Sequence, residues 1–152
     1  MLGLLRPSGS LAIVRAPLAD VAASLTVVVL SIDRFTLGKR RWRGKAVDGR
    51  EFGFDLEKSL RHGEAFFATD TQVYRIEQAA EPLLRIRLQT PAQSATVAWQ
   101  IGNMHFPVQV EPDHLMVEDD AILRQVLERE RIAFEPITGI FQPLSGASAH
   151  RH

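Results

Sequence analysis

The second half of the chain holds the pattern that most limits the fold, because two helix signatures alternate there with short strand signatures. The first helix is predicted over residues 90–103. Thr90 suits the N-cap, Pro91 fits the first helical position, and Gln93 stands three residues after the cap, as a capping box requires. The Gly-Asn pair at 102–103 tolerates a left-handed backbone, so we expect the helix to stop there.

A second helix is predicted over residues 118–130, because its acidic start suits the helix dipole and its apolar residues recur at helical spacing. Short strands are predicted before, between and after the helices, at residues 83–88, 105–110, 114–117 and 131–137. The resulting order of elements, β-α-β-β-α-β, is typical of the split βαβ or ferredoxin-like arrangement.

The first half of the chain predicts short strands separated by turn residues. An Asp-Gly pair at 48–49, between two extended runs, predicts a hairpin. Several short strands with frequent turns favour a small sandwich or barrel-like domain. The expected fold class is therefore α+β, with an N-terminal all-β small domain at 1–88, a ferredoxin-like βαββαβ domain at 89–142 and a flexible histidine-containing tail at 143–152.

Charge is divided between the halves of the chain, although the formal total is zero. Residues 1–95 carry 14 basic and 10 acidic side chains, whereas residues 96–140 carry three and eight. The halves therefore suggest units with different partners, and the acidic one would tolerate a cation. With no cysteine there is no disulfide or thiolate metal site. The longest apolar run, residues 21–32, is too short to span a bilayer, so we expect a cytoplasmic protein.

Catalytic motifs are missing from the sequence, which has no G-x-S-x-G, no glycine-rich phosphate loop and no H-E-x-x-H. The acidic stretch at 118–120 is explained by a helix N-terminus without any chemistry. The basic stretch GKRRWRGK at 38–45 suits nucleic acid or an exposed edge strand whose charges discourage pairing. The neutral total favours the edge strand or a protein-partner surface.

The histidines are the candidate metal ligands, since imidazole binds nickel, copper and zinc well. His105 follows the predicted helix stop and should be accessible. One exposed histidine is not a site, but a two-fold dimer would bring two copies to one ion. His150 and His152 either complete such a site from the tail or form a solvated chain end. A contribution from His114 stays open, and His62 has no expected role.

The chain resembles the UreE family of urease accessory proteins over roughly residues 20–142. The resemblance in the first half rests on a hairpin, the next segment and the exit of the domain, through Asp48, Gly49, Glu51, Gly53, Leu56, Leu60, Arg61, Gly63, Ala80, Glu81 and Pro82. In the second half IGNMHFPVQV resembles the family signature LGNRHxPxQ, matched by Gly102, Asn103, His105, Pro107 and Gln109. Met104 stands where arginine is usual, and the tail has few histidines.

The resemblance implies a carrier and not an enzyme, namely a nickel metallochaperone that delivers Ni(II) for maturation of the urease active site. His105 would be the metal ligand shared across a homodimer, and His150 or His152 would add ligands. Zn(II) or Cu(II) can replace nickel in vitro. The implied partners are the urease accessory GTPase and the urease apoprotein complex, with neither nucleic acid nor membrane. The alternatives are a non-metal adaptor that binds proteins through the β domain, or an RNA-binding protein that uses KRRWR.

Overall fold

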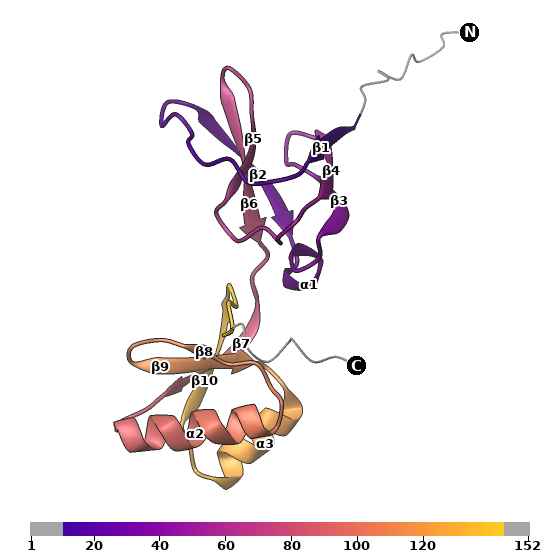
Figure 1. The fold of residues 1–152 in the computed structure, drawn as a ribbon. Coiled ribbons are helices and arrows are strands. Elements are labelled where there is room, and N and C mark those ends of the chain that lie inside the picture. Colours follow the sequence, from indigo (N-terminus) through magenta and orange to yellow (C-terminus); the bar gives the residue numbers. More distant parts are fainter. Residues whose placement is uncertain (1–10, 145–152) are drawn as a thin grey trace, which may run out of the picture. The chain divides into compact units, whose positions relative to one another are not determined.

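The structure, a computed structural model, describes residues 11–144. These residues form a mixed α+β protein that divides between Ala79 and Ala80 into two compact units, called here the N-terminal and the C-terminal unit. Each unit has its own hydrophobic core. The helices and strands of each unit are labelled in Figure 1. No helix described over these residues has the length and apolar character needed to cross a membrane.

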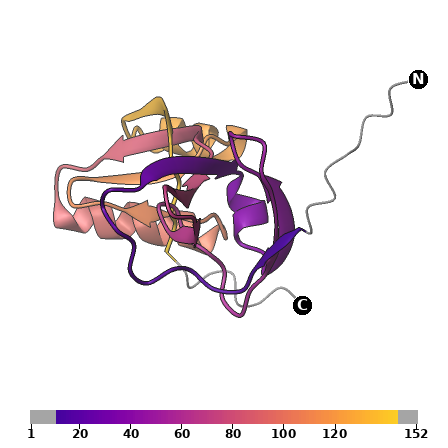
Figure 2. The same ribbon diagram turned by 90° about the horizontal axis from the view of Figure 1, so that it is seen from above.

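The N-terminal unit contains two three-stranded sheets. The first sheet has the order β1-β4-β3, formed by Ala12–Val14, Glu51–Asp55 and Arg41–Lys45. The second has the order β2-β6-β5, formed by Thr26–Ile32, Gln72–Gln78 and Ala65–Ala68. In each sheet one pair of strands is parallel and the other antiparallel. The segment between β1 and β2 follows a long course along the outside of the unit (Figure 2).

A short helix, α1 (Arg34–Leu37), interrupts the strands, so the N-terminal unit is rich in β-structure but is not all-β as expected. Asp33 starts this helix, since its carboxylate accepts a hydrogen bond from the Thr36 amide at 2.9 Å. The predicted hairpin is confirmed: β3 and β4 are antiparallel, and Gly49 in the turn between them has a positive φ of 89°.

Aromatic rings fill the core of the N-terminal unit. Phe52 contacts both Phe66 and Tyr74 edge-on, with ring centroids 5.0 and 5.1 Å apart. Tyr74 is 1% exposed, and its hydroxyl donates a hydrogen bond to the Asp48 carboxylate at 2.7 Å. The core is therefore tied to the hairpin turn by a buried side chain with a polar end.

Replacing Tyr74 by phenylalanine is expected to cost about 1 kcal/mol of unfolding free energy at pH 7, because the ring stays and the hydrogen bond is lost. The same bond is the main reason that the pKa of Asp48 lies below its ordinary value. A lowered carboxyl pKa adds stability above the unfolded-state pKa and loses it as pH falls through the folded-state value. Urea denaturation at pH 7 and pH 3 should therefore show the gap between Tyr74→Phe and the parent shrinking in acid. An equal gap at both pH values would contradict this account.

The C-terminal unit has the element order β7, α2, β8, β9, α3, β10. Its four strands form one antiparallel sheet in the order β10-β7-β9-β8, from Phe134–Gly139, Glu81–Arg87, His114–Glu118 and Gln109–Val110. Both helices, α2 (Pro91–Asn103) and α3 (Ala121–Arg129), lie on the same side of this sheet (Figure 1). The core between the helices and the sheet is made by Leu84, Ile86, Val97, Ile101, Leu115, Val117, Leu123 and Leu127.

Strand β7 belongs with the C-terminal unit because it pairs with β9 and β10. The division of the chain therefore falls before this strand, whereas the sequence placed the end of the first domain at residue 88. The strand expected over 105–110 is reduced to two residues in β8. Pro107 has no N–H to donate, which disfavours strand pairing there.

Candidate metal centre

Helix α2 carries the candidate ligand at its C-terminal end, and its start is built as predicted. The hydroxyl of Thr90 accepts a hydrogen bond from the Gln93 amide at 3.1 Å, and Pro91 occupies the first turn. The Gln93 side chain reaches back to the Gln89 amide at 3.0 Å, one residue earlier than a capping box requires. These contacts fix where the helix begins and therefore where its last turn lies.

The last turn of α2 ends in a left-handed residue, and that residue is His105. Its φ is 64°, and its amide donates a hydrogen bond to the Gly102 carbonyl at 2.9 Å. The amide of Phe106 donates to the Ile101 carbonyl at 3.3 Å. These two bonds form a Schellman motif with His105 at the position that glycine usually occupies. The helix stops at Asn103, as predicted, and the left-handed residue of the stop is His105, not a member of the Gly-Asn pair at 102–103.

This geometry holds the backbone of His105 firmly and leaves its side chain exposed. Phe106 packs on the core cluster that contains Ile101, which anchors the chain directly after the histidine. The C-terminal end of a helix carries a partial negative charge, so a cation is favoured near it. His105 is thus an accessible imidazole on a fixed backbone at a position suited to a bound cation.

The end of the described chain lies against the loop that follows His105. Phe141 is fully buried, and the Gln142 amide donates to the Gln109 side chain at 2.7 Å. The Leu144 amide donates to the Val108 carbonyl at 2.9 Å, three residues after His105. The two tail histidines predicted as ligands, His150 and His152, lie outside the described residues.

His114 opens β9 and is bound to its neighbour, since its Nδ1 lies 2.6 Å from Oδ1 of Asp113. This contact holds the pKa of Asp113 below its ordinary value. In the N-terminal unit, Nδ1 of His62 accepts a hydrogen bond from the Gln78 amide at 3.1 Å. Within residues 11–144 no three His, Cys, Asp or Glu side chains are grouped so that they could hold a metal ion.

Comparison of the amino-acid sequence with known proteins finds matches to a single family. A family model described as the C-terminal domain of the UreE urease accessory protein matches residues 81–152. Urease accessory protein UreE of Brucella abortus biovar 1 (strain 9-941) is 32% identical over 148 residues, which cover 94% of this chain and 84% of that protein. The UreE of Chelativorans sp. (strain BNC1) is 31% identical over 126 residues, covering 81% of this chain and 80% of its own.

The chain belongs to the UreE family of urease accessory proteins. Proteins of this name are accessory proteins and not enzymes, which agrees with the expectation from the sequence. The match extends over both units, because the Brucella alignment spans nearly the whole chain.

The acidic stretch of this UreE-family chain at 118–120 is largely occupied in building α3. Oδ1 of Asp120 accepts hydrogen bonds from the Ile122 and Leu123 amides at 2.7 and 3.2 Å, as the predicted cap requires. The Arg124 guanidinium donates two hydrogen bonds to the Asp119 carboxylate, at 2.6 and 2.8 Å. These bonds hold the pKa of that carboxyl below its usual range. These two carboxylates are therefore structural in this conformation.

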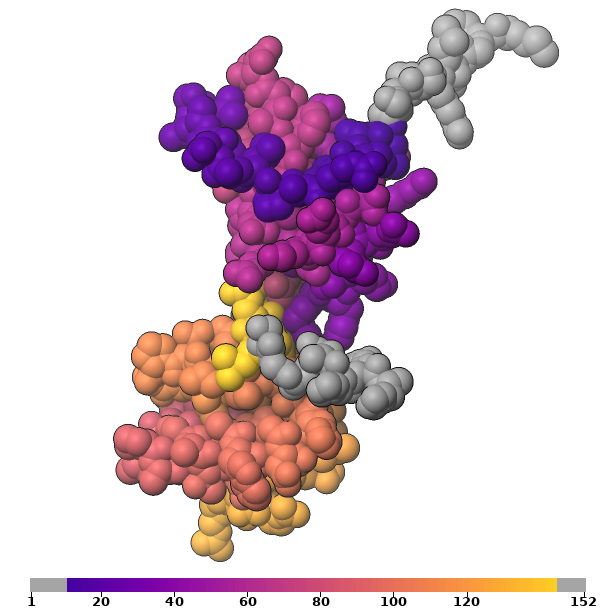
Figure 3. Space-filling view, viewed as in Figure 1, coloured from indigo at the N-terminus to yellow at the C-terminus, as the bar shows by residue number. Residues whose placement is uncertain are grey.

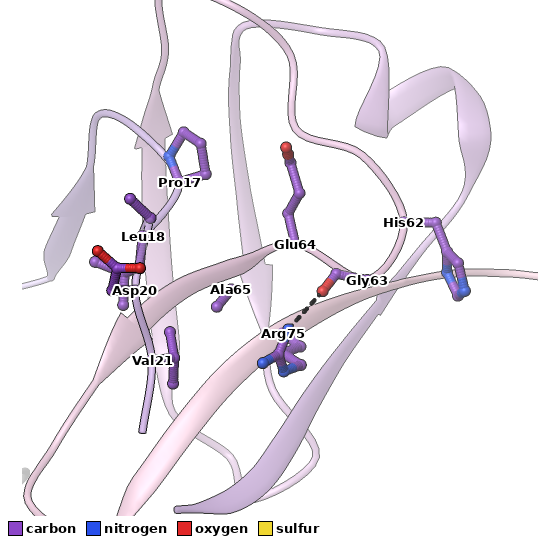
Figure 4. A pocket seen from close by; sticks show the side chains of 10 residues that line it. Pro17, Leu18, Asp20, Val21, His62, Gly63, Glu64, Ala65 and Arg75 are labelled. Atoms are coloured by element: carbon purple, nitrogen blue, oxygen red, sulfur yellow. Dashed lines mark hydrogen bonds between the residues drawn. The ribbon is translucent and has the colours of Figure 1, made fainter. Parts of the chain in front are cut away.

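A hollow of about 720 Å³ lies in the N-terminal unit between the segment that follows β1 and the turn before β5 (Figure 4). Arg75 donates to the Gly63 carbonyl at 2.9 Å, and the Glu64 carboxylate accepts from the Arg61 amide at 2.8 Å. The carboxylates of Asp20 and Glu64 lie apart in this view, and His62 is at the far end. The hollow therefore does not gather metal ligands.

Proposed function

We propose that this protein is a nickel-binding metallochaperone that carries Ni(II) for maturation of the urease active site. One ion would be shared by the His105 side chains of two protomers. The observation that carries the proposal is the exposed, left-handed His105 at the end of α2, in a chain of the UreE family. Few protein ligands at an open surface, with water in the other positions, allow the ion to be released to a partner.

The exposed side of α2 supports a two-fold dimer with His105 near its axis. The helix carries no charged residue from Pro91 to Asn103, and Trp99 on it is 68% exposed. Near a two-fold axis each residue approaches its own copy, so charges would repel there. Interface centres are depleted of charge and enriched in tryptophan. A homodimer that pairs through this side of α2 would bring both copies of His105 to one place.

The end of the described chain supports a role for His150 and His152 as additional ligands. Leu144 is bonded to Val108, and His150 is six residues further along the chain. Six residues of extended chain span at most about 20 Å. His105 is only three residues from Val108, so the tail can reach it.

We also infer that the C-terminal unit is a ferredoxin-like domain, which its element order and the sheet order β10-β7-β9-β8 support. The N-terminal unit would bind partners, the C-terminal unit would bind metal, and the tail from residue 143 would supply histidines. The partners that receive the ion would be the urease accessory GTPase and the urease apoprotein complex, in the cytoplasm.

Calorimetric titration of the full chain with Ni(II) at pH 7 tests the proposal. We expect half an ion per chain, because two protomers share one site. Imidazole binds metal only when it is neutral, so nickel affinity should fall as the solution is made more acidic. Parallel titrations should show Cu(II) binding more tightly and Zn(II) in the same range as nickel. A full ion per chain, or no binding, would count against the shared site.

A non-metal adaptor is the second candidate function, and the exposed edge strand β3 of the N-terminal unit favours it. An adaptor would keep its oligomeric state and its partner binding in the presence of a chelator, whereas a shared metal site couples dimer stability to nickel.

A further inference from the structure

The outward side of the sheet β1-β4-β3, called here the basic face, carries more positive than negative charge. Alternate residues of β3 point outward, and all three of them are basic: Arg41, Arg43 and Lys45. Arg15, directly after β1, adds a fourth basic side chain. The neighbouring strand β4 opposes them with two carboxylates, Asp55 and Glu51. Residues at and around β3, purple in Figure 3, project from the surface of the N-terminal unit.

The two carboxylates are already engaged. Asp55 binds Arg41 at 2.8 Å and Arg15 at 3.0 Å, and these contacts hold its pKa below the ordinary value. Glu51 binds Lys45 at 3.2 Å. Arg43 lies between these pairs and has no ion-pair partner within residues 11–144. The central cation of the basic face is thus the one left without a carboxylate in this part of the chain.

Arg43 has no carboxylate beside it in the sheet because the residue opposite it on β4 is Gly53. A Cβ atom at Gly53 would lie 2.8 Å from Cδ1 of Ile13 and 3.0 Å from Cδ2 of Leu11. The side-chain ends of Leu11 and Ile13 fill the space beside Gly53, and the position opposite Arg43 offers no carboxylate to pair with it. The space beside it is a hollow of about 330 Å³ whose lining includes Ile13, Arg41, Arg43 and Asp55.

A second hollow, of about 400 Å³, is lined by Arg40, Arg41, Asp55 and Leu56. The two hollows share Arg41 and Asp55, so they adjoin one another. Ile13 lines the first hollow, is 52% exposed and offers apolar contact beside Arg43. An apolar neighbour strengthens an ion pair because it excludes water from one side of the charges.

We propose that the basic face binds an extended acidic segment of a partner protein, with one carboxylate paired to Arg43. Charge complementarity selects this occupant. The chain's own residues 1–10 contain Arg6 and no acidic residue, so they cannot supply the carboxylate. The role is separate from nickel binding, because it uses only the N-terminal unit.

Single-stranded RNA fits the same charge less well. Sequence-tolerant binding of single strands relies on exposed aromatic rings on which bases stack. The tryptophan of this stretch, Trp42, is half-buried and is itself stacked on Phe54, with ring centroids 3.7 Å apart and planes 11° from parallel. Its ring is therefore used within the unit.

Fluorescence anisotropy with labelled ten-residue probes tests the proposal on the full chain. The probes are a peptide of alternating glutamate and valine, the same peptide with glutamine for glutamate, and a single-stranded oligouridine. The variants are Arg43→Gln, Arg43→Lys and, as a matched exposed arginine in the C-terminal unit, Arg87→Gln. The parent should bind the glutamate peptide and not the glutamine peptide. Arg43→Gln should weaken binding about tenfold, as expected for loss of a hydrogen-bonded charge, while the other two variants stay within about threefold.

The proposal is overturned if the parent does not bind the glutamate peptide, if it binds the glutamine peptide equally, or if Arg43→Gln binds as the parent does. Binding of oligouridine in preference to the glutamate peptide would also overturn it, in favour of nucleic acid. Arg43 is exposed, so its replacement should leave the far-ultraviolet spectrum and the melting temperature unchanged.

Discussion

Replacing His105 by glycine is expected to abolish tight nickel binding and at the same time to stabilise the C-terminal unit. His105 holds a φ of 64° at the Schellman position of α2, where an L-residue costs about 1 kcal/mol relative to glycine. Its side chain is exposed, so no packing is lost when it is removed. Under the proposed function the imidazole is the shared ligand, and its loss should weaken nickel binding by more than about 100-fold. Calorimetry and urea denaturation measure the two effects on the same variant.

The chain offers a matched control for the stability part of this result. Arg131 follows α3 with a φ of 57°, and the Ile132 amide donates to the Leu127 carbonyl at 2.8 Å in the same type of motif. Arg131→Gly should therefore give a similar gain of about 1 kcal/mol and leave nickel binding unchanged. If His105→Gly gained stability and still bound nickel as tightly as the parent, His105 would not be the ligand. If both variants were destabilised, the left-handed backbone would not be the costly feature.

The sequence predicted the two helices of the C-terminal unit well because the signals for helix starts are local. Thr90 and Asp120 cap their helices through bonds to amides two or three residues away. The end of α2 was also predicted correctly, since the helix stops at Asn103. The left-handed residue that completes the stop is His105, because Phe106 packs on the core cluster that contains Ile101, and that packing is not visible in the local pattern.

Long-range pairing in the N-terminal unit could not be predicted from the sequence. The hairpin at Gly49 was found because its two strands are joined by a recognisable turn. The parallel register that sets Ile13 against Gly53 joins segments 40 residues apart, and no local signal marks it. The hairpin register sets Arg43 opposite Gly53, and the parallel register places Ile13 on the other side of that glycine. The surroundings of Arg43 are therefore complete only in the folded unit.

Replacing Trp99 by glutamate is expected to separate the proposed dimer. Trp99 is 68% exposed on the uncharged side of α2, so the change should not disturb the fold of one protomer. In a two-fold interface the substitution removes an aromatic contact and places two like charges near each other. We expect the dissociation constant of the dimer, measured by analytical ultracentrifugation, to rise by at least about 30-fold, because central tryptophans are worth about 2 kcal/mol or more.

Nickel affinity should fall together with the dimer in Trp99→Glu, although His105 is unchanged, because each protomer alone would keep only one of the two shared ligands. Ile122→Glu is the matched control, since Ile122 is also an exposed apolar residue on a helix of this unit, with 57% exposure on α3. That variant should remain dimeric and bind half an ion per chain. A dimer that survives Trp99→Glu and dissociates with Ile122→Glu would move the interface to α3. Loss of the dimer with nickel affinity retained would show that one protomer holds the ion without its partner, and the shared-histidine mechanism would then be wrong.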